Sequence, residues 1–406
     1  MTLALLSALL VRVEVLGLLH PGEAWIEGAA KTLHAVAEGD AVRLDGGAPA
    51  PEVRLGLHGP GAAALRVRVV LLQAPREFDG VLILTARRGT LLLVNEVRLE
   101  AYVAGVVAAE LSPDAPEAAA AALAVVARSF AERRTQERDR PGAFDARPGL
   151  HAPHPAGAGL CDQTHCQVYA GHAPAPARQA AARTEGEVLL LASGRVAPAL
   201  HHAACGGRTS DTRDVWPAAD DEEAEAGAAV DDPLPGSVPA SRRPGAPPGI
   251  APRELAACGE LAGEAPLRWT VALSEAQLGR ALGLTPPLGV TAETGRGGLL
   301  RLLHAPGLGK VSAEELHLRL GRALGWDVVR SPRFTFEESP PEAGGGPAAS
   351  APRTWTLHGS GHGHGVGLCQ RGAVALATRG AAAHLILARY FPRLRIGPLP
   401  RGPETR

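Results

Sequence analysis

The chain has little net charge, few cysteines and no long apolar run, and each of these absences argues against a class of protein. Its formal net charge is −1 over 406 residues, and basic residues do not alternate with aromatic ones, which argues against a nucleic-acid-binding surface. Five cysteines are too few for a disulfide scaffold in a chain of this length. No run approaches the roughly 20 apolar residues of a membrane-spanning helix. We therefore expect neither a nucleic-acid partner nor a membrane span.

Hydrophobic residues make up 46% of the chain, which is ample for a core. Apolar and charged residues alternate through much of 11–94, the pattern of strands with one solvated face. The segments 81–85 and 90–94 flank Arg87-Arg88-Gly89, which predicts a hairpin. Residues 1–98 are thus expected to form a β-rich lobe.

A helix is predicted directly after this lobe. Its apolar positions follow helical spacing and are Leu99, Tyr102, Val103 and Val106. Glu110 falls near the end of this helix, because Pro113 blocks its continuation. A carboxylate at a corner between apolar helices is partly desolvated, which raises its pKa toward the range of a general acid.

A second helix is expected to begin almost at once. Asp114 and Glu117 have the spacing of a capping box at its start. The expected buried stripe of this helix is Leu123, Val126, Ala127 and Phe130. Two helices would then meet at a corner that holds Glu110.

The sequence as a whole predicts an α+β protein in which two lobes form a cleft. We expect a β-rich lobe at 1–98, a helical segment with a cysteine motif and a hairpin at 99–216, and a C-terminal lobe at 253–398. Acidic residues and then Pro and Gly dominate 217–252, and Gly and Pro dominate 339–352. Both stretches are predicted to be flexible insertions.

Cys161, His165 and Cys166 lie within six residues. Thiolate and imidazole are the ligands that zinc prefers, although the spacing is not that of a zinc finger. The residues alone leave a metal site, a disulfide and two buried thiols open. The fourth ligand of a metal here would be His151, His154, Cys205 or water.

A glycine-rich stretch, 359–367, contains His362 and His364. Glycines permit positive φ and close approach to a ligand, so this stretch is expected to line a cleft. A His-x-His pair on a strand would face one side and suit a metal. A tight loop with exposed imidazoles is the alternative.

Four motifs in this order resemble those of the stage II sporulation protein D family (SpoIID/LytB), whose members act on bacterial cell-wall glycan. The first is Tyr-Val-Ala-Gly-Val-Val-Ala-Ala-Glu at 102–110, followed by Ala-Val-Val-Ala-Arg-Ser at 124–129. The others are Cys-Asp-Gln-Thr-His-Cys-Gln-Val-Tyr at 161–169, His-Ala-Ala-Cys-Gly-Gly-Arg-Thr at 202–209, and the glycine-histidine segment at 361–373.

The resemblance implies a lytic transglycosylase that cleaves peptidoglycan glycan strands. Glu110 would be the general acid and base, and Arg128 a fixed cation that orients Glu110 or a substrate group. His202, His364 and Gln370 match family positions in the cleft that binds the glycan. The resemblance also implies a structural zinc near the 161–166 cluster.

Several residues depart from the family pattern. Phe130 stands where tyrosine is frequent, Ala203 and Cys369 where serine is usual, and His362 and Arg371 where aromatic residues are common. The changes at Phe130, Ala203 and Cys369 would each loosen a polar contact to sugar. The resemblance therefore also implies a second function, a glycan-binding protein that enhances a cell-wall amidase without cutting the glycan. A third, a metal-dependent hydrolase, would use the cysteine-histidine cluster together with His362 and His364.

A cell-wall substrate implies a location outside the cytoplasm. Residues 1–10 are apolar, but they have no basic segment and no small-residue cleavage site, so the sequence gives no clear export signal. Extracytoplasmic placement is thus an expectation that comes from the substrate.

Overall fold

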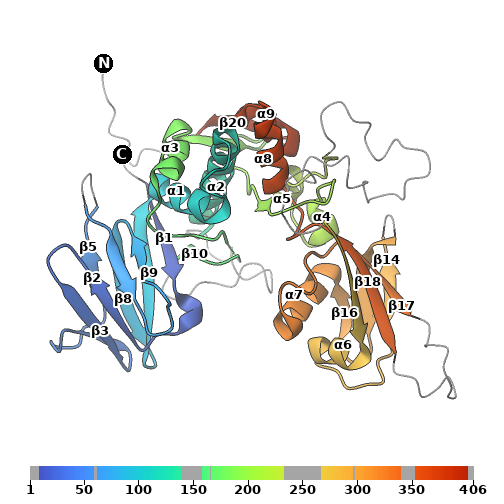
Figure 1. Cartoon of the computed structure of the whole chain (residues 1–406), viewed down its shortest axis with the longest axis horizontal. Helices are drawn as coiled ribbons and strands as arrows, with labels where there is room; N and C mark the ends of the chain where they lie inside the picture. Colours follow the sequence, from blue (N-terminus) through green and yellow to red (C-terminus); the bar gives the residue numbers. More distant parts are fainter. Residues whose placement is uncertain are drawn as a thin grey trace. The chain divides into compact units, whose positions relative to one another are not determined.

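The computed structural model contains several separate sheets together with helices, and a run of strands precedes the first α-helix, which confirms the predicted α+β class (Figure 1). The structure describes residues 9–58, 62–138, 158–164, 166–232, 267–295, 298–339 and 353–400. The chain divides into two units. Unit 1 comprises Met1–Leu189, Val196–Pro198 and Ile396–Arg406, and unit 2 comprises Leu190–Arg195 and Ala199–Arg395. Among the described residues, no helix combines the length and apolar character that crossing a membrane requires.

Unit 1 is built on two five-stranded sheets. Val11, Val13 and Val15 are fully buried on the first strand, as the alternation predicts. The predicted hairpin is also present, since Arg87 pairs with Thr90. One sheet has the order β10 (Leu160–Cys161), β1 (Leu10–Val15), β9 (Thr90–Arg98), β8 (Val81–Arg87), β5 (Val53–Gly56). The other has the order β4 (Ala41–Leu44), β3 (Thr32–Glu38), β2 (Glu23–Glu27), β6 (Leu65–Arg68), β7 (Arg76–Phe78).

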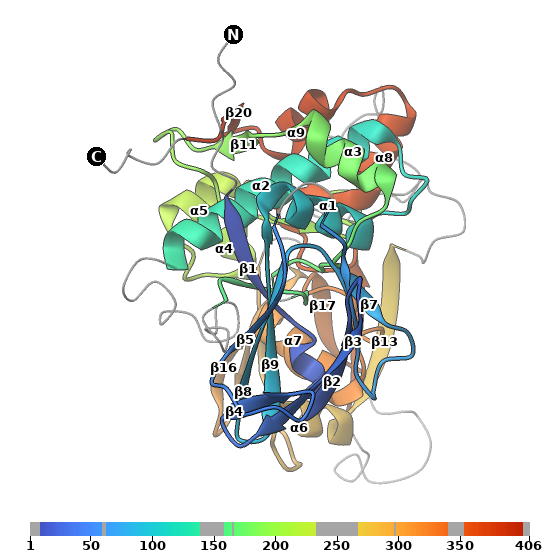
Figure 2. The same cartoon turned by 90° about the vertical axis from the view of Figure 1, so that its left-hand side faces the viewer.

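Three helices of unit 1 gather near one end of these strands in both views (Figures 1 and 2). They are α1 (Leu99–Glu110), α2 (Glu117–Arg138) and α3 (Ala175–Arg183). α1 begins where β9 ends, and its four predicted apolar positions are all buried. The strands β11 (Glu187–Leu190) and β20 (Arg395–Pro398) pair beside them. Glu110 is the last residue of α1, as expected.

The predicted start of the second helix is wrong. The backbone carbonyl of Pro116, not that of Asp114, accepts the first helical hydrogen bonds, from the amides of Ala119 and Ala120. A helix capped at Asp114 would need helical geometry at Ala115, and the residue before a proline disfavours that geometry. The amide of Asp114 instead donates to Ser112 Oγ. The predicted stripe from Leu123 to Phe130 is buried.

Unit 2 contains two three-stranded antiparallel sheets and one short parallel pair. The sheets are β13 (Arg268–Ser274), β18 (Thr354–Ser360), β17 (Phe334–Ser339) and β14 (Thr291–Thr294), β15 (Leu300–Ala305), β16 (Gly309–Ser312). Two helices cover a shared core that includes Leu273 and Trp355: α6 (Glu275–Leu282) and α7 (Ala313–Leu324). The remaining helices are α4 (Thr212–Val215), α5 (Asp221–Ala226), α8 (Gln370–Thr378) and α9 (Ala383–Tyr390).

The parallel pair joins two segments that are distant in sequence. The sequence also predicts a hairpin with strands at 187–191 and 196–202, and its turn is present, because the amides of Leu191 and Ala197 donate to the carbonyls of Arg195 and Leu189. Beyond the turn, the named strand in 196–202 is β12 (His201–His202). It pairs in parallel with β19 (Leu368–Cys369), so that His202 stands opposite Cys369. Parallel neighbours need a long connection, and here the connection is most of unit 2.

The first predicted insertion is partly wrong. Residues 217–232 contain α5, which begins with a capping box formed by Asp220 and Glu223. Acidic side chains favour a helix N-terminus, which explains why this acidic stretch folds. The Asp232 side chain is fully buried. Residues 233–252 and 340–352, the rest of the two predicted insertions, lie outside the described residues.

Candidate functional site

Glu110 lies half-buried at the C-terminal end of α1. The backbone N–H of Val168 donates a hydrogen bond of 3.0 Å to its Oε1. Val168 belongs to the segment that follows Cys166, so this hydrogen bond links the carboxylate to the end of the cysteine motif. The orientation of Glu110 therefore depends on how that segment is held.

A glycine in the middle of α1 allows this segment to approach the helix. A Cβ at Gly105 would lie 2.4 Å from the ring of Tyr169 and 2.7 Å from the carbonyl oxygen of Gly171. Its own carbonyl accepts the amide of Ala170. Glycine weakens a helix interior by about 1 kcal/mol, and here it admits a backbone that a larger residue would exclude. An isolated glycine in a helical pattern is the one sequence signal of this contact.

Two buried tyrosines hold the same segment. Tyr102 donates to Gln167 Oε1 at 3.2 Å, Tyr169 donates to Asn95 Oδ1 at 2.7 Å, and the two rings lie 5.1 Å apart. Burial raises the pKa of Tyr102 well above its ordinary value, and the nearby thiols and the Glu110 carboxylate raise it further. Both hydroxyls are therefore protonated donors at neutral pH. Sequence reasoning did not identify these tyrosines or Gln167 as supports of Glu110.

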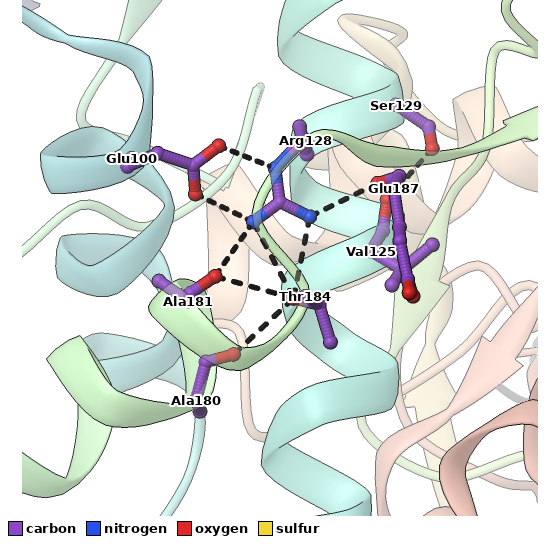
Figure 3. Close-up of polar contacts among 8 residues, drawn as sticks. All are labelled: Glu100, Val125, Arg128, Ser129, Ala180, Ala181, Thr184 and Glu187. Atoms are coloured by element: carbon purple, nitrogen blue, oxygen red, sulfur yellow. Dashed lines mark hydrogen bonds and ion pairs between the residues drawn. The ribbon is translucent and has the colours of Figure 1, made fainter. Parts of the chain in front are cut away.

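Arg128 joins several elements of unit 1 through a network of polar contacts (Figure 3). Its side chain is fully buried, and Nε and Nη2 bind the two carboxylate oxygens of Glu100 at 2.8 and 2.6 Å. The other guanidinium bonds go to Thr184 Oγ1 and to the carbonyls of Ala181 and Glu187. The expected pairing with Glu110 is thus replaced by an ion pair with Glu100 among the described residues. Arg128 positions α1, α2, α3 and β11 relative to one another.

Cys161 and Cys166 lie together as thiols in unit 1. A hydrogen bond with Cys161 and the Arg134 guanidinium lower the pKa of the Cys166 thiol, against the opposing effect of burial. Adjacent thiols of which one is acidified fit a metal that binds thiolates. His165, and the further candidate ligands His151 and His154, lie outside the described residues. A zinc ion at the predicted cluster of Cys161, His165 and Cys166 remains a prediction.

The predicted glycan-contacting residues lie in unit 2. The rings of His202 and His364 meet edge-on at 5.8 Å, and Trp216 packs against His364 at 5.3 Å. Burial lowers the pKa of His202 well below its ordinary value, so this imidazole is neutral. Gln370, the first residue of α8, is 8% exposed. The structure thus brings His202 and His364 together and places Gln370 next to the residue that pairs with His202.

The His-x-His pair lies in a loop and not on a strand. β18 ends at Ser360, and alternate glycines from Gly361 to Gly367 have φ between +78° and +84°. A Cβ at Gly367 would lie 2.2 Å from the carbonyl oxygen of Leu200, so the loop follows the 200–205 segment closely. His364 contacts His202, whereas exposed His362 forms a bridge with Ala204. The loop form of the prediction is therefore correct.

Part of the chain matches a known protein family. Residues 87–191 match SpoIID, the stage II sporulation protein family. The chain carries a SpoIID domain. The function of this family is related to the cell wall in sporulation. The SpoIID domain extends from the end of β8 to β11, and it contains Glu110, Arg128, Cys161 and Cys166.

An uncharacterized protein of Brachyspira hyodysenteriae is 31% identical over 142 residues. The alignment covers 34% of this chain and 34% of that protein, so the chain spans about a third of the relative it matches. The site residues in the SpoIID domain all belong to unit 1, whereas His202, His364 and Gln370 lie beyond it, in unit 2. The cleft expected to unite the two sets remains a prediction.

Proposed function

We propose that this chain is a lytic transglycosylase that cleaves the linkage between N-acetylmuramic acid and N-acetylglucosamine in peptidoglycan. The observation that carries the proposal is the Glu110 carboxylate, which lies within the SpoIID domain at a helix end and is oriented by the Val168 amide. A half-buried, oriented carboxyl is the kind of group that general acid catalysis needs. The substrate would be reached outside the cytoplasm.

The reaction needs one carboxyl group that acts twice. Protonated Glu110 would donate its proton to the glycosidic oxygen as the bond breaks through an oxocarbenium-like state. The resulting carboxylate would then accept the proton of the muramic acid 6-hydroxyl as that oxygen bonds to C1. The product is a 1,6-anhydro ring, and Glu110 returns to its protonated form. Attack from within the substrate benefits from an effective molarity of about 10⁵ M or more.

Three acidic residues of the SpoIID domain bear on whether a second carboxyl group takes part in the reaction. A hydrolase generally uses a second carboxylate, roughly 5 to 9.5 Å from the first. Glu100 is bound to Arg128, and Glu117 forms an ion pair with Arg183. Asp162 is buried against Arg76 at 2.6 Å. Each of these three acids has a structural partner, which favours a mechanism with a single carboxyl group.

The test is mass spectrometry of purified glycan strands after incubation with the wild-type chain and with Glu110→Gln. We expect anhydromuramyl products from the wild type and a fall in their rate of about 10²- to 10⁴-fold in the variant, since proton transfer is lost. Glu185→Gln is the matched control, because Glu185 is exposed in the same domain. Strands that are bound but left uncut by the wild type would instead identify a glycan-binding protein, such as an amidase enhancer.

A further inference from the structure

Three buried metal-ligating side chains meet in unit 2, outside the SpoIID domain. A ring nitrogen of His202 and the sulfurs of Cys205 and Cys369 all lie within 4.8 Å of one another. Their residues are 4%, 1% and 0% exposed. The parallel pairing of β12 with β19 brings them together, because it sets His202 opposite Cys369. Neither cysteine forms a disulfide.

Of the two ring nitrogens of His202, Nδ1 forms a hydrogen bond and Nε2 does not, among the described atoms. Nδ1 lies 3.1 Å from the carbonyl oxygen of Val366, and since a carbonyl only accepts, Nδ1 carries the proton. Nε2 then bears a lone pair. It is buried and has no hydrogen-bond partner among the described atoms. Metal-binding histidines are oriented in this manner, with one nitrogen on a carbonyl and the other on the metal.

Backbone amides point at both sulfurs. Cys369 Sγ accepts from Cys205 N–H at 3.3 Å and from Gly372 N–H, in the first turn of α8, at 3.4 Å. Cys205 Sγ accepts from Gly207 N–H at 3.3 Å. Amide donors and a helix N-terminus stabilise sulfur as the thiolate, the form that binds a metal.

An acidic residue completes the surroundings of the cluster. Asp232 is fully buried, and its Oδ2 lies 3.2 Å from Cys205 Sγ. Its Oδ1 accepts from the Tyr390 hydroxyl at 2.8 Å and lies 3.4 Å from Arg389 Nε. The Cys205 thiol donates to Asp232 Oδ2, so a carboxylate that can accept the thiol proton lies next to this sulfur.

We propose that His202, Cys205 and Cys369 bind one Zn²⁺ ion. Tetrahedral zinc with Zn–S bonds of about 2.3 Å places two sulfur ligands about 3.8 Å apart, which fits a cluster whose atoms lie within 4.8 Å. Binding displaces the two thiol protons to solvent and forms two Zn–S bonds and one Zn–N bond. All three ligands belong to unit 2, whereas Cys161 and Cys166 belong to unit 1.

The role of the metal would be structural. It would join β12 to β19 and so fix the glycine loop between β18 and β19, in which His364 contacts His202. Gln370 directly follows a ligand. The metal would thus set the positions of the residues that the family resemblance assigns to glycan binding.

The test uses the full chain with Cys161, Cys166 and Cys258 changed to Ser, so that Cys205 and Cys369 are the remaining thiols. Cobalt(II) is added to the metal-stripped protein, and sulfur-to-cobalt charge-transfer absorption is recorded in the near ultraviolet. We expect one equivalent to bind and excess Zn²⁺ to abolish the absorption. In the same background, His202→Ala should weaken binding by more than the roughly 10- to 100-fold that loss of an outer-shell partner costs. A folded variant that gives no such absorption would overturn the proposal.

A second measurement covers the case in which the variant does not fold. Wild-type crystals grown with Zn²⁺ are measured above and below the zinc absorption edge. An anomalous difference peak bounded by His202 Nε2 and the two sulfurs supports the site. Well-ordered side chains with no peak between them, or a Cys205–Cys369 disulfide, would refute it.

Discussion

The two cysteine clusters of this chain differ in how the sequence encodes them. Cys161 and Cys166 are close in sequence, and their spacing alone marks them as a motif. Cys205 and Cys369 are separated by 164 positions and meet only because two short strands pair in parallel. Spacing along the sequence can reveal metal ligands that lie within one turn. Ligands on distant segments can be recognised only when the topology of the fold is known.

The largest effect on stability is expected from Arg128, which ties the helices of unit 1 together. Arg128→Ala removes a fully buried cation and its hydrogen bonds to Glu100, Thr184 and two backbone carbonyls, and breaking such a pair is strongly destabilising. Because Glu100 is 30% exposed, we expect a loss of about 3 kcal/mol in the free energy of unfolding. Urea denaturation measures it. Arg43→Ala, which breaks an exposed pair with Glu38, should leave the free energy of unfolding nearly unchanged.

A stable Arg128→Ala variant that no longer cleaves glycan would contradict this assignment. Arg128 would then act on the substrate or on Glu110, as the sequence suggested, and not as a link between helices.

Glu314, a half-buried residue of unit 2 with one buried carboxyl oxygen, should make stability depend on pH. Burial raises the pKa of Glu314 from 4.5 to about 7. Between these values the folded state binds more protons than the unfolded state, so stability falls as pH rises through this window, by about 3 kcal/mol. Glu314→Gln should remove this fall in urea denaturation at a series of pH values. Glu315→Gln, at a half-exposed neighbour, should leave it in place.

A smaller effect is expected from Gly105→Ala. The new Cβ would overlap Tyr169 and the carbonyl of Gly171, and overpacking of this kind costs about 1–3 kcal/mol. It would also displace Val168 from Glu110, so glycan cleavage should fall together with stability. Ala109→Gly, at an exposed site on the same helix, should cost about 1 kcal/mol from helix propensity alone and spare activity. Greater stability in Gly105→Ala would show that Tyr169 does not pack there.

The smallest effect concerns two candidate helix caps, one in each unit. Asp220→Ala removes the capping box of α5 and should cost about 1 kcal/mol. Asp114→Ala should cost nearly nothing, because Asp114 caps no helix. Thermal denaturation of the two variants compares them directly. Equal losses of stability would show that Asp114 caps a helix, as the sequence predicted.

Regular elements were the most predictable part of this chain. The alternation of Val11, Val13 and Val15 and the helical spacing from Leu99 to Val106 are local patterns, and the structure confirms both. The boundaries of α2 and α5 were less predictable. Proline sets the first through backbone geometry and an aspartate sets the second through capping, and composition reveals neither effect.

The surroundings of the candidate site were harder to predict. Glu110 was located at its helix end from one proline, but its partner Val168 is 58 residues away. The partner of Arg128 is on another helix, and the buried role of Asp232 depends on Tyr390, 158 residues further along the chain. Contacts of this range arise from packing, and spacing along the sequence carries no signal of them.

The most direct test of the central claim is to run the glycan reaction in H₂¹⁸O and weigh the products. If the 6-hydroxyl of the muramic acid is the nucleophile and Glu110 is the acid and base, the anhydro products contain no ¹⁸O. Reducing ends that carry one ¹⁸O atom would show that water attacks C1, and would contradict transglycosylation by this chain.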